Sequence, residues 1–415
     1  MARSTFRSLK VFNFRVWAAG SLVSNIGSWM QRTAQDWLVL TALTHNNASA
    51  VGIVVALQFA PQVLLLPATG FAVDHFDKRK LIFATQTAMG LLALALGLLV
   101  VTGLVRLWQV DIFAFLLGCA AAFDMPARQA FVSELVGEAD LGNALALNST
   151  SFNAARMIGP AAAGLLIAAV GTGAVFLINA ASFLAVLASL VFLRRDALHS
   201  RDRTERRRGG LIEGFRYVWQ RGDLKTILLM LLVVGMFGLN FPIFISTMAV
   251  LVFHAGAGRF GFLTAMMALG SVAGALFTAR RDNPNMQVLL VSALLFGLAC
   301  GLAALTPTYI VFGLVLVTVG FAVQTFTTST NSLVQLSIAP QMRGRVLAIL
   351  LAIALGGTPV GAPIIGWMAD RFGPRVALGV GAASGFVAAI IACVYLVRYS
   401  SLLEVRPEAD KVREA

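Results

Sequence analysis

The chain has 415 residues, of which 58% are apolar and 12% are charged, and its formal net charge is +13 at pH 7. Soluble domains carry about 25% charged residues, so this composition excludes an ordinary soluble protein and predicts an integral membrane protein. The sequence contains no P-loop, no G-x-S-x-G and no H-E-x-x-H motif. We therefore expect neither ATP hydrolysis by a P-loop nor hydrolase chemistry, and we expect a protein that is not an enzyme and needs no cofactor.

Apolar stretches long enough to cross a bilayer recur along the whole chain. A spanning helix needs about 20 apolar residues. Such stretches are found near residues 17–40, 51–73, 81–102, 108–130, 144–170, 172–193, 225–252, 260–279, 287–305, 309–330, 345–369 and 375–397. The sequence therefore predicts an all-α protein with twelve transmembrane helices, six on each side of a charged central segment.

The distribution of Lys and Arg predicts the orientation in the membrane. With the N-terminus placed inside, 26 of the 32 Lys and Arg residues fall on the inner side and 4 on the outer side. Basic residues favour the cytoplasmic side, so we expect a multi-pass protein of a bacterial inner membrane with both termini in the cytoplasm. The positive charge then faces anionic lipid, and we expect no nucleic-acid partner.

The central segment is the one linker of the chain. It predicts a domain of residues 1–197, a basic cytoplasmic linker of residues 198–224, and a domain of residues 225–415 that ends in a short cytoplasmic tail. Within the linker, LIEGFRYVWQ (211–220) places Leu211, Phe215, Val218 and Trp219 on one helical face. Two interpretations remain open, a helix lying on the membrane surface and a turn leading into the seventh span.

The two halves share a spacing of glycines. Gly159, Gly164 and Gly171 recur as Gly361, Gly366 and Gly373, each at an offset of 202 residues. Repeats of membrane helices are the construction of many secondary transporters, which bind substrate between the repeats. The chain is therefore expected to form two pseudo-symmetric six-helix bundles.

No metal site is expected. The three cysteines, Cys119, Cys300 and Cys393, each lie alone in a different span, and the four histidines do not cluster. The cysteines are interpreted as small packing residues.

The loop after the second span carries a motif. It reads Gly70-Phe-Ala-Val-Asp74-His-Phe-Asp-Lys78-Arg79-Lys80. With the twelve spans and the long central loop, it resembles the G-x-L-a-D-r-x-G-r-K loop of the major facilitator superfamily over the whole chain. The matching residues are Gly70, Asp74, Lys78 and Arg79, and the resemblance implies that they form an inner gate. A second similar stretch, Gly366 to Arg375, falls on the outer side and is not interpreted as the same gate.

Other stretches resemble one branch of that superfamily. Gly159-Pro160-Ala-Ala-Ala-Gly164 is similar to the G-P-x-x-G motif of proton-driven antiporters, with one extra residue. Ordinary packing of small residues would also explain these glycines. Residues 27–43, 123–136 and 330–349 resemble the drug and macrolide efflux branch that also contains enterobactin exporters.

The resemblance implies a secondary active transporter. We expect export of amphipathic small molecules of the drug, macrolide or siderophore type, with protons and the lipid bilayer as the other partners and a monomer as the working unit. An importer or a lipid flippase of the same fold is the first alternative. A non-transporting membrane sensor is the second, although no loop is long enough for a sensory domain.

Charged residues inside the spans are the candidates for the site, because such residues are costly in a membrane. Arg32 and Asp36 in the first span, and Asp124 and Arg128 in the fourth, each lie one helical turn apart. The remaining candidates are Arg156 in the fifth span and the neighbouring amides Gln31 and Gln35. Either the pairs are structural ion pairs, or Asp36 or Asp124 takes up the coupling proton in a central cavity. Trp29, Trp37, Phe241 and Phe244 are candidates for an apolar substrate wall.

Overall fold

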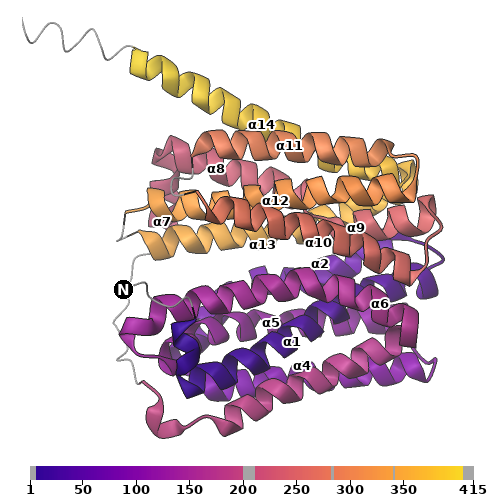
Figure 1. Cartoon of the computed structure of the whole chain (residues 1–415), viewed down its shortest axis with the longest axis vertical. Coiled ribbons are helices and arrows are strands. Elements are labelled where there is room, and N and C mark those ends of the chain that lie inside the picture. The colour runs from indigo at the N-terminus through magenta and orange to yellow at the C-terminus, as the bar shows by residue number, and fades with distance from the viewer. Residues whose placement is uncertain (1–5, 200–210, 282–284, 340–341, 405–415) are drawn as a thin grey trace, which may run out of the picture. The chain divides into compact units, whose positions relative to one another are not determined.

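The computed structural model describes residues 6–199, 211–281, 285–339 and 342–404. All regular secondary structure in these residues is helical (Figure 1). The α-helices are α1 (Phe12–Leu38), α2 (Ala48–Leu64), α3 (Leu66–His75), α4 (Lys78–Val101), α5 (Leu107–Leu135), α6 (Glu138–Phe192), α7 (Leu211–Gln220), α8 (Gly222–Val233), α9 (Phe241–Thr247), α10 (Ala257–Ala279), α11 (Met286–Leu305), α12 (Tyr309–Ser337), α13 (Arg343–Phe372) and α14 (Pro374–Glu404).

The helices follow the spans expected from hydropathy. Within the described residues, nine helices are long and apolar enough to cross a membrane, and ten if α2 and α3, which meet at a bend of 54°, are one span. The 55-residue α6 covers both the fifth and the sixth expected spans. The first expected span forms α1, which holds Arg32 and Asp36 and is not among the nine. The fold class is confirmed, and the count of twelve stays a prediction.

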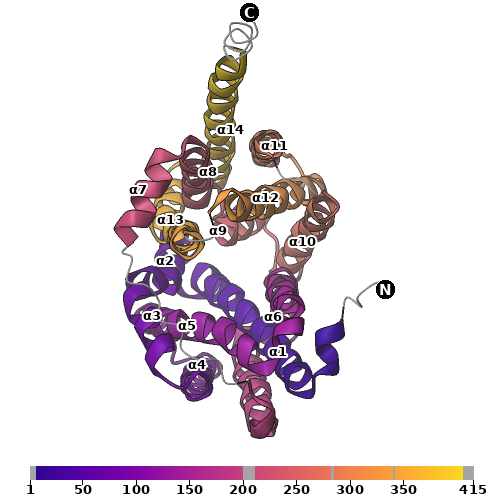
Figure 2. The same cartoon turned by 90° about the vertical axis from the view of Figure 1, so that its left-hand side faces the viewer.

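The chain forms two compact units. Unit 1 contains residues 1–206, 242–265 and 362–370, and unit 2 contains residues 207–241, 266–361 and 371–415. In unit 1, α6 packs on α1 and α4, and α2 packs on α5; in unit 2, α11 packs on α12 and α14. Figure 2 shows α4 and α6 nearly end-on. The division into domains at residues 198–224 remains a prediction.

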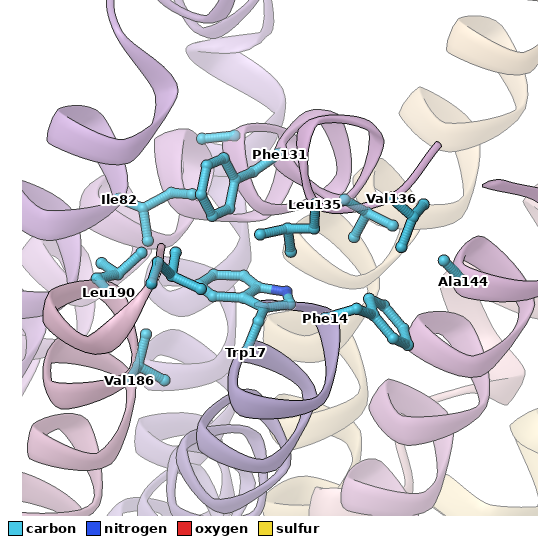
Figure 3. Packing of buried hydrophobic residues seen from close by; sticks show 12 residues of the cluster. Phe14, Trp17, Ile82, Phe131, Leu135, Val136, Ala144, Val186 and Leu190 are labelled. Atoms are coloured by element: carbon cyan, nitrogen blue, oxygen red, sulfur yellow. The ribbon is translucent and has the colours of Figure 1, made fainter. Parts of the chain in front are cut away.

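One end of unit 1 is held by a cluster of buried apolar side chains (Figure 3). Phe14 and Trp17 of α1 lie against Phe131 and Leu135 of α5, and the rings of Trp17 and Phe131 meet edge to face at 5.2 Å. Lipid is as apolar as a leucine side chain, so close van der Waals packing and not transfer from water stabilises this contact. The cluster fixes α1, α5 and α6 relative to one another.

The repeated glycines occupy equivalent places. Gly171 and Gly373 both adopt left-handed backbone angles, with φ of 80° and 92°, and each joins two successive spans. A Cβ on Gly159 would lie 2.5 Å from the Cβ of Trp29 in the first span, and one on Gly361 would lie 1.6 Å from the carbonyl oxygen of Met236 in the seventh. These close approaches of helices confirm that the offset of 202 residues is a structural repeat.

The two halves also share a backbone feature that their sequences do not indicate. The first and seventh spans both end in a π-helical turn, Val39–Leu43 and Met248–Val252. Each turn is followed by a histidine in the left-handed region, His45 at φ 50° and His254 at φ 49°. The two halves therefore also resemble each other at the ends of these spans, at an offset of 209 residues, where the shared amino acid is a single histidine.

The expected amphipathic segment is a helix. α7 covers residues 211–220, and the side chain of Leu211 lies outside the described residues, as do residues 200–210 of the linker. The expected common face is split: Phe215 and Trp219 are exposed, whereas Val218 is buried. The Glu213 carboxylate forms an ion pair with Arg345 at 2.5 Å. This arrangement leaves two aromatic side chains free to contact a membrane surface.

Candidate functional site

The carboxylate of Asp36 is enclosed near the end of α1. Its side chain is 4% exposed, and its Oδ1 accepts one hydrogen bond, from Nε2 of Gln58 on α2, at 3.4 Å. Gln35 donates to the carbonyl oxygen of Val110 at 3.1 Å, and Gln31 accepts from the Asn179 amide while its own Nε2 has no partner. The side chains of Gln31, Gln35 and Asp36 thus face the interior of unit 1, as their cost in lipid requires.

Arg32 does not form an ion pair with Asp36, which corrects the structural-pair interpretation for these two residues. Both are described, and no ion pair within 4.0 Å joins them. The guanidinium carbon of Arg32 instead lies 4.7 Å from the ring centre of Phe59 and 5.5 Å from that of Trp29. Its Nη1 is buried without a hydrogen-bond partner. Cation–π contacts attract the charge but leave hydrogen-bond donors unused.

Asp124 and Arg128 of α5 do form the pair expected from their spacing, at 3.5 Å. Oδ1 of Asp124 also accepts hydrogen bonds at 2.8 Å from Thr85 Oγ1 and Gln86 Nε2, both on α4. Arg128 in turn lies 5.4 Å from the ring centre of Trp17. The charge of Asp124 is thus well compensated by three groups, in contrast with that of Asp36.

The antiporter-like motif lies on α6, where it meets α1. Gly159 packs against the backbone and Cβ of the first span, and a Cβ on Gly164 would lie 2.2 Å from the Cα of Gly261. Pro160 lies within the helix between them. Close packing of small residues therefore accounts for the glycines. Arg156, one turn before Gly159, has an exposed side chain on the same helix.

The inner-gate motif is anchored within unit 1. Lys78 Nζ forms an ion pair at 2.5 Å with Glu134, and the Arg79 guanidinium donates to the carbonyl oxygen of Leu190 at 2.7 and 3.1 Å. Asp74 is exposed at the end of α3. A Cβ on Gly70 would have no neighbour within 4 Å, so nothing in the described residues packs closely against this glycine.

The non-matching Asp77 of the motif has a function of its own in the fold. It stands where the superfamily motif has glycine, and its carboxylate accepts from the backbone N–H of Lys80 at 2.9 Å. This interaction caps the first turn of α4. The departure from the family pattern therefore exchanges a flexible turn for a helix cap.

At the opposite end of unit 1, Asp370 of α13 binds the first turn of α2. Its two carboxylate oxygens accept from the backbone N–H groups of Ala48 and Ser49 at 2.7 and 2.8 Å, and from Ser49 Oγ at 2.5 Å. The helices also touch through glycine, since a Cβ on Gly366 would lie 2.4 Å from the Ala48 carbonyl oxygen. Asp370 belongs to the second stretch that resembles the loop motif, Gly366 to Arg375, and this stretch therefore caps the end of a helix.

Two of the proposed wall aromatics are packing residues. Trp37 is buried and stacks on Phe260 at 4.9 Å, and Phe244 is buried. Trp29 is partly exposed and meets the Phe152 ring of α6 at 6.1 Å. In the part of the chain that the structure describes, no group of three His, Cys, Asp or Glu could hold a metal ion.

Several polar partners were missed. They share one signal, an uncharged polar side chain inside an apolar span: Gln58, Thr85, Gln86 and Asn179. Such residues are costly in lipid and could have been selected on that ground. Their pairing with particular residues of α1 and α5 required the packing of the helices.

Comparison with known proteins gives a consistent assignment. The chain is 26% identical over 371 residues to the multidrug efflux pump Tap of Mycolicibacterium fortuitum, covering 85% of this chain and 88% of the relative. It is 25% identical to the staphyloferrin A transporter of Staphylococcus aureus, covering 86% and 89%, and 24% identical to macrolide efflux protein A of Streptococcus pyogenes, covering 89% and 92%.

Solved structures share the fold. A bacterial homologue of the human lysosomal transporter Spinster superposes with a TM-score of 0.72 at 14% identity, covering 95% of this chain and 97% of that one. The nucleoside transporter NupG superposes with a TM-score of 0.69 at 14% identity, covering 92% and 99%. The family model described as transmembrane secretion effector matches residues 3–411, and the chain therefore belongs to this family of major facilitator superfamily transporters.

Proposed function

We propose that this protein exports amphipathic small molecules of the drug, macrolide or siderophore type from the cytoplasm in exchange for protons. In this proposal it works as a monomer in the bacterial cell membrane with both termini in the cytoplasm. Relatives named as a multidrug efflux pump and a macrolide efflux protein support the substrate class. The charge distribution of the loops supports the orientation.

The contrast between two buried carboxylates carries the proton part of the proposal. Asp124 interacts with two hydrogen-bond donors and with Arg128, all of which stabilise its charged form. Asp36 has one hydrogen bond, at 3.4 Å, and Arg32 lies beyond ion-pair distance. Gaining a proton therefore disturbs fewer interactions at Asp36. We assign Asp36 as the proton-binding residue and keep Asp124 as the competing candidate.

Transport by everted membrane vesicles or oriented proteoliposomes with an acidic lumen tests this assignment. The wild-type protein should accumulate a fluorescent amphipathic dye in the lumen, driven by the pH gradient. Asp36→Asn keeps the size and hydrogen bonding of the side chain but cannot carry a proton. This variant should bind the dye and lose uphill transport.

The outcomes separate the candidates. If Asp36→Asn pumps normally and Asp124→Asn does not, the proton site is Asp124. If both variants pump normally, coupling through these carboxylates is wrong, and a uniporter or another coupling ion is the better explanation.

An importer or a lipid flippase of the same fold is the alternative, because the residues described above do not by themselves set the direction of transport. Import predicts that the dye accumulates in right-side-out vesicles that carry the physiological pH gradient. Accumulation of the dye there, with none in everted vesicles, would show that the protein imports and does not export.

A further inference from the structure

Unit 1 carries a basic aromatic face, which has no role in the proton exchange proposed above. It is defined by Trp29 and Arg32 of α1, Phe59 of α2, and Phe152 and Arg156 of α6. All five side chains are partly or fully exposed although they lie within helices expected to cross the membrane. Packing contacts connect four of them: Arg32 lies over Trp29 and Phe59, and Trp29 meets Phe152. Arg156 lies one helical turn after Phe152 on α6. The face therefore combines two cations with three aromatic rings.

The relative height of the two arginines follows from helix register. Ser8 bonds to Asn143 near the start of both helices, and Trp29 packs against Gly159 further along, so α1 and this part of α6 run in the same direction. Arg32 lies three residues beyond Trp29, and Arg156 lies three residues before Gly159. At 1.5 Å per residue, their Cα atoms differ in height by about 9 Å, and the Cα atom of Trp29 lies between them in height.

Among the described residues, no protein carboxylate forms an ion pair with Arg32. Asp36 is buried and bonds to Gln58, and Asp124 is engaged in the network on α4 and α5. Arg32 has an unpartnered Nη1 and no ion pair within 4.0 Å. A guanidinium inside a membrane protein whose donors are not all used is costly, and a carboxylate or similar oxyanion can accept from it in a bidentate geometry.

We propose that this basic aromatic face binds the anionic group, foremost a carboxylate, of an amphipathic substrate, with Arg32 as the principal anchor. The proposal rests on the proposed transport function and names its substrate class. Trp29, Phe59 and Phe152 contact the apolar body of the substrate. Arg156 supplies a second positive charge, about 9 Å from Arg32 along the helix axes. A lipophilic cation finds no exposed carboxylate among these five residues and is bound less well.

An anionic substrate has an energetic consequence. An inside-negative potential favours the exit of a negative charge by about 2.3 kcal/mol per 100 mV, which adds to any proton gradient.

Equilibrium binding to the purified full-length protein in detergent tests the proposal. The probes are rhodamine 110 and its methyl ester, rhodamine 123, which differ by one free carboxylate, and fluorescence anisotropy measures their Kd. We expect the acid to bind at least about tenfold more tightly than the ester. Arg32→Gln should raise the Kd of the acid by about ten- to a hundredfold, which is the contribution of one hydrogen bond between charged groups. The same variant should raise the Kd of the ester by less than about threefold.

Matched variants control for indirect effects. Arg15→Gln removes an exposed arginine at the start of the same helix and should leave both affinities unchanged. Arg32→Lys keeps the charge but loses the planar fork, so it should retain part of the preference for the acid. If Arg32→Gln does not give a monodisperse, cooperatively unfolding protein, Arg156→Gln takes its place and should reduce the same preference.

The proposal is overturned if the wild-type protein binds the ester as tightly as the acid, or if the preference survives removal of the arginine. Failure to bind either dye at about 100 μM would also overturn it, because an anchored carboxylate with an aromatic body should bind more tightly than that. The measurement uses no ion gradient. A protein that binds the acid as expected but ignores a pH gradient therefore refutes only the proton antiport.

Discussion

Asp370 offers a direct test of how the structure holds one end of unit 1 together. Its carboxylate accepts from the N–H groups of Ala48 and Ser49, while Asn47 accepts from the N–H of Ala50 at 2.9 Å. Asp370→Ala leaves α2 with its cap from Asn47 but removes all three hydrogen bonds that Asp370 accepts from Ala48 and Ser49. Loss of a capping side chain costs about 0.5–2 kcal/mol, and loss of a charge at a helix N-terminus costs about 0.3–1 kcal/mol.

The two contributions together are about 1–3 kcal/mol, or a roughly 5- to 150-fold change in the equilibrium between the closed and open forms of this contact. Asp370→Asn keeps one acceptor oxygen and loses the charge, so we expect about 1 kcal/mol and a change of roughly fivefold. In both variants, α13 and the first turn of α2 should therefore separate more often, by the factors just given.

Hydrogen exchange at single-residue resolution measures the effect. The amides of Ala48 and Ser49 should exchange faster in Asp370→Ala by the factor given above. The amide of Lys80, capped by Asp77 at the start of α4, serves as an internal control and should not change. Conversely, Asp77→Ala should accelerate hydrogen exchange at the Lys80 amide and leave the exchange of the Ala48 and Ser49 amides unchanged. Unchanged exchange at Ala48 and Ser49 in Asp370→Ala would show that Asp370 does not close this end of the molecule in solution.

Two further predictions concern the repeat and the loop motif. Gly361→Ala should strongly lower the thermal unfolding midpoint in detergent or abolish insertion, because its Cβ would lie 1.6 Å from a carbonyl oxygen of the neighbouring helix. Gly344→Ala is the control and should be tolerated, because a Cβ there would have no neighbour within 4 Å. Equal midpoints for the two variants would contradict the packing at Gly361. Asp74→Asn should impair transport in vesicles while insertion stays normal, and wild-type transport by this variant would show that the matched motif is inert here.

Much of the fold was predictable because the membrane restricts the choices of the backbone. In lipid every backbone polar group needs an internal partner, so long apolar stretches must be helices. The same stretches located α4, α5 and α10 to α14. The glycine spacing also predicted the repeat, since close helix packing and the left-handed turns at Gly171 and Gly373 both require the absence of a side chain.

The sequence also selected the residues of the site without giving their partners. Charge inside a span is costly wherever the helix packs, and this identified Arg32, Asp36, Asp124 and Arg128. The one-turn spacing predicted the same ion pair for both couples, yet only Asp124 and Arg128 form it. Helical spacing fixes which residues share a face, but rotamers and neighbouring helices decide what each side chain contacts.

By itself, then, the sequence determined the membrane helices, the two-fold repeat and the costly polar residues, because these depend on local composition and spacing. Only the tertiary structure decided that Asp36 has one long hydrogen bond, that Arg32 lies between aromatic rings, and that Asp370 caps a helix 321 residues away. Such interactions join helices that are distant in the chain, and their energies depend on distances of a few ångströms that only the packing sets.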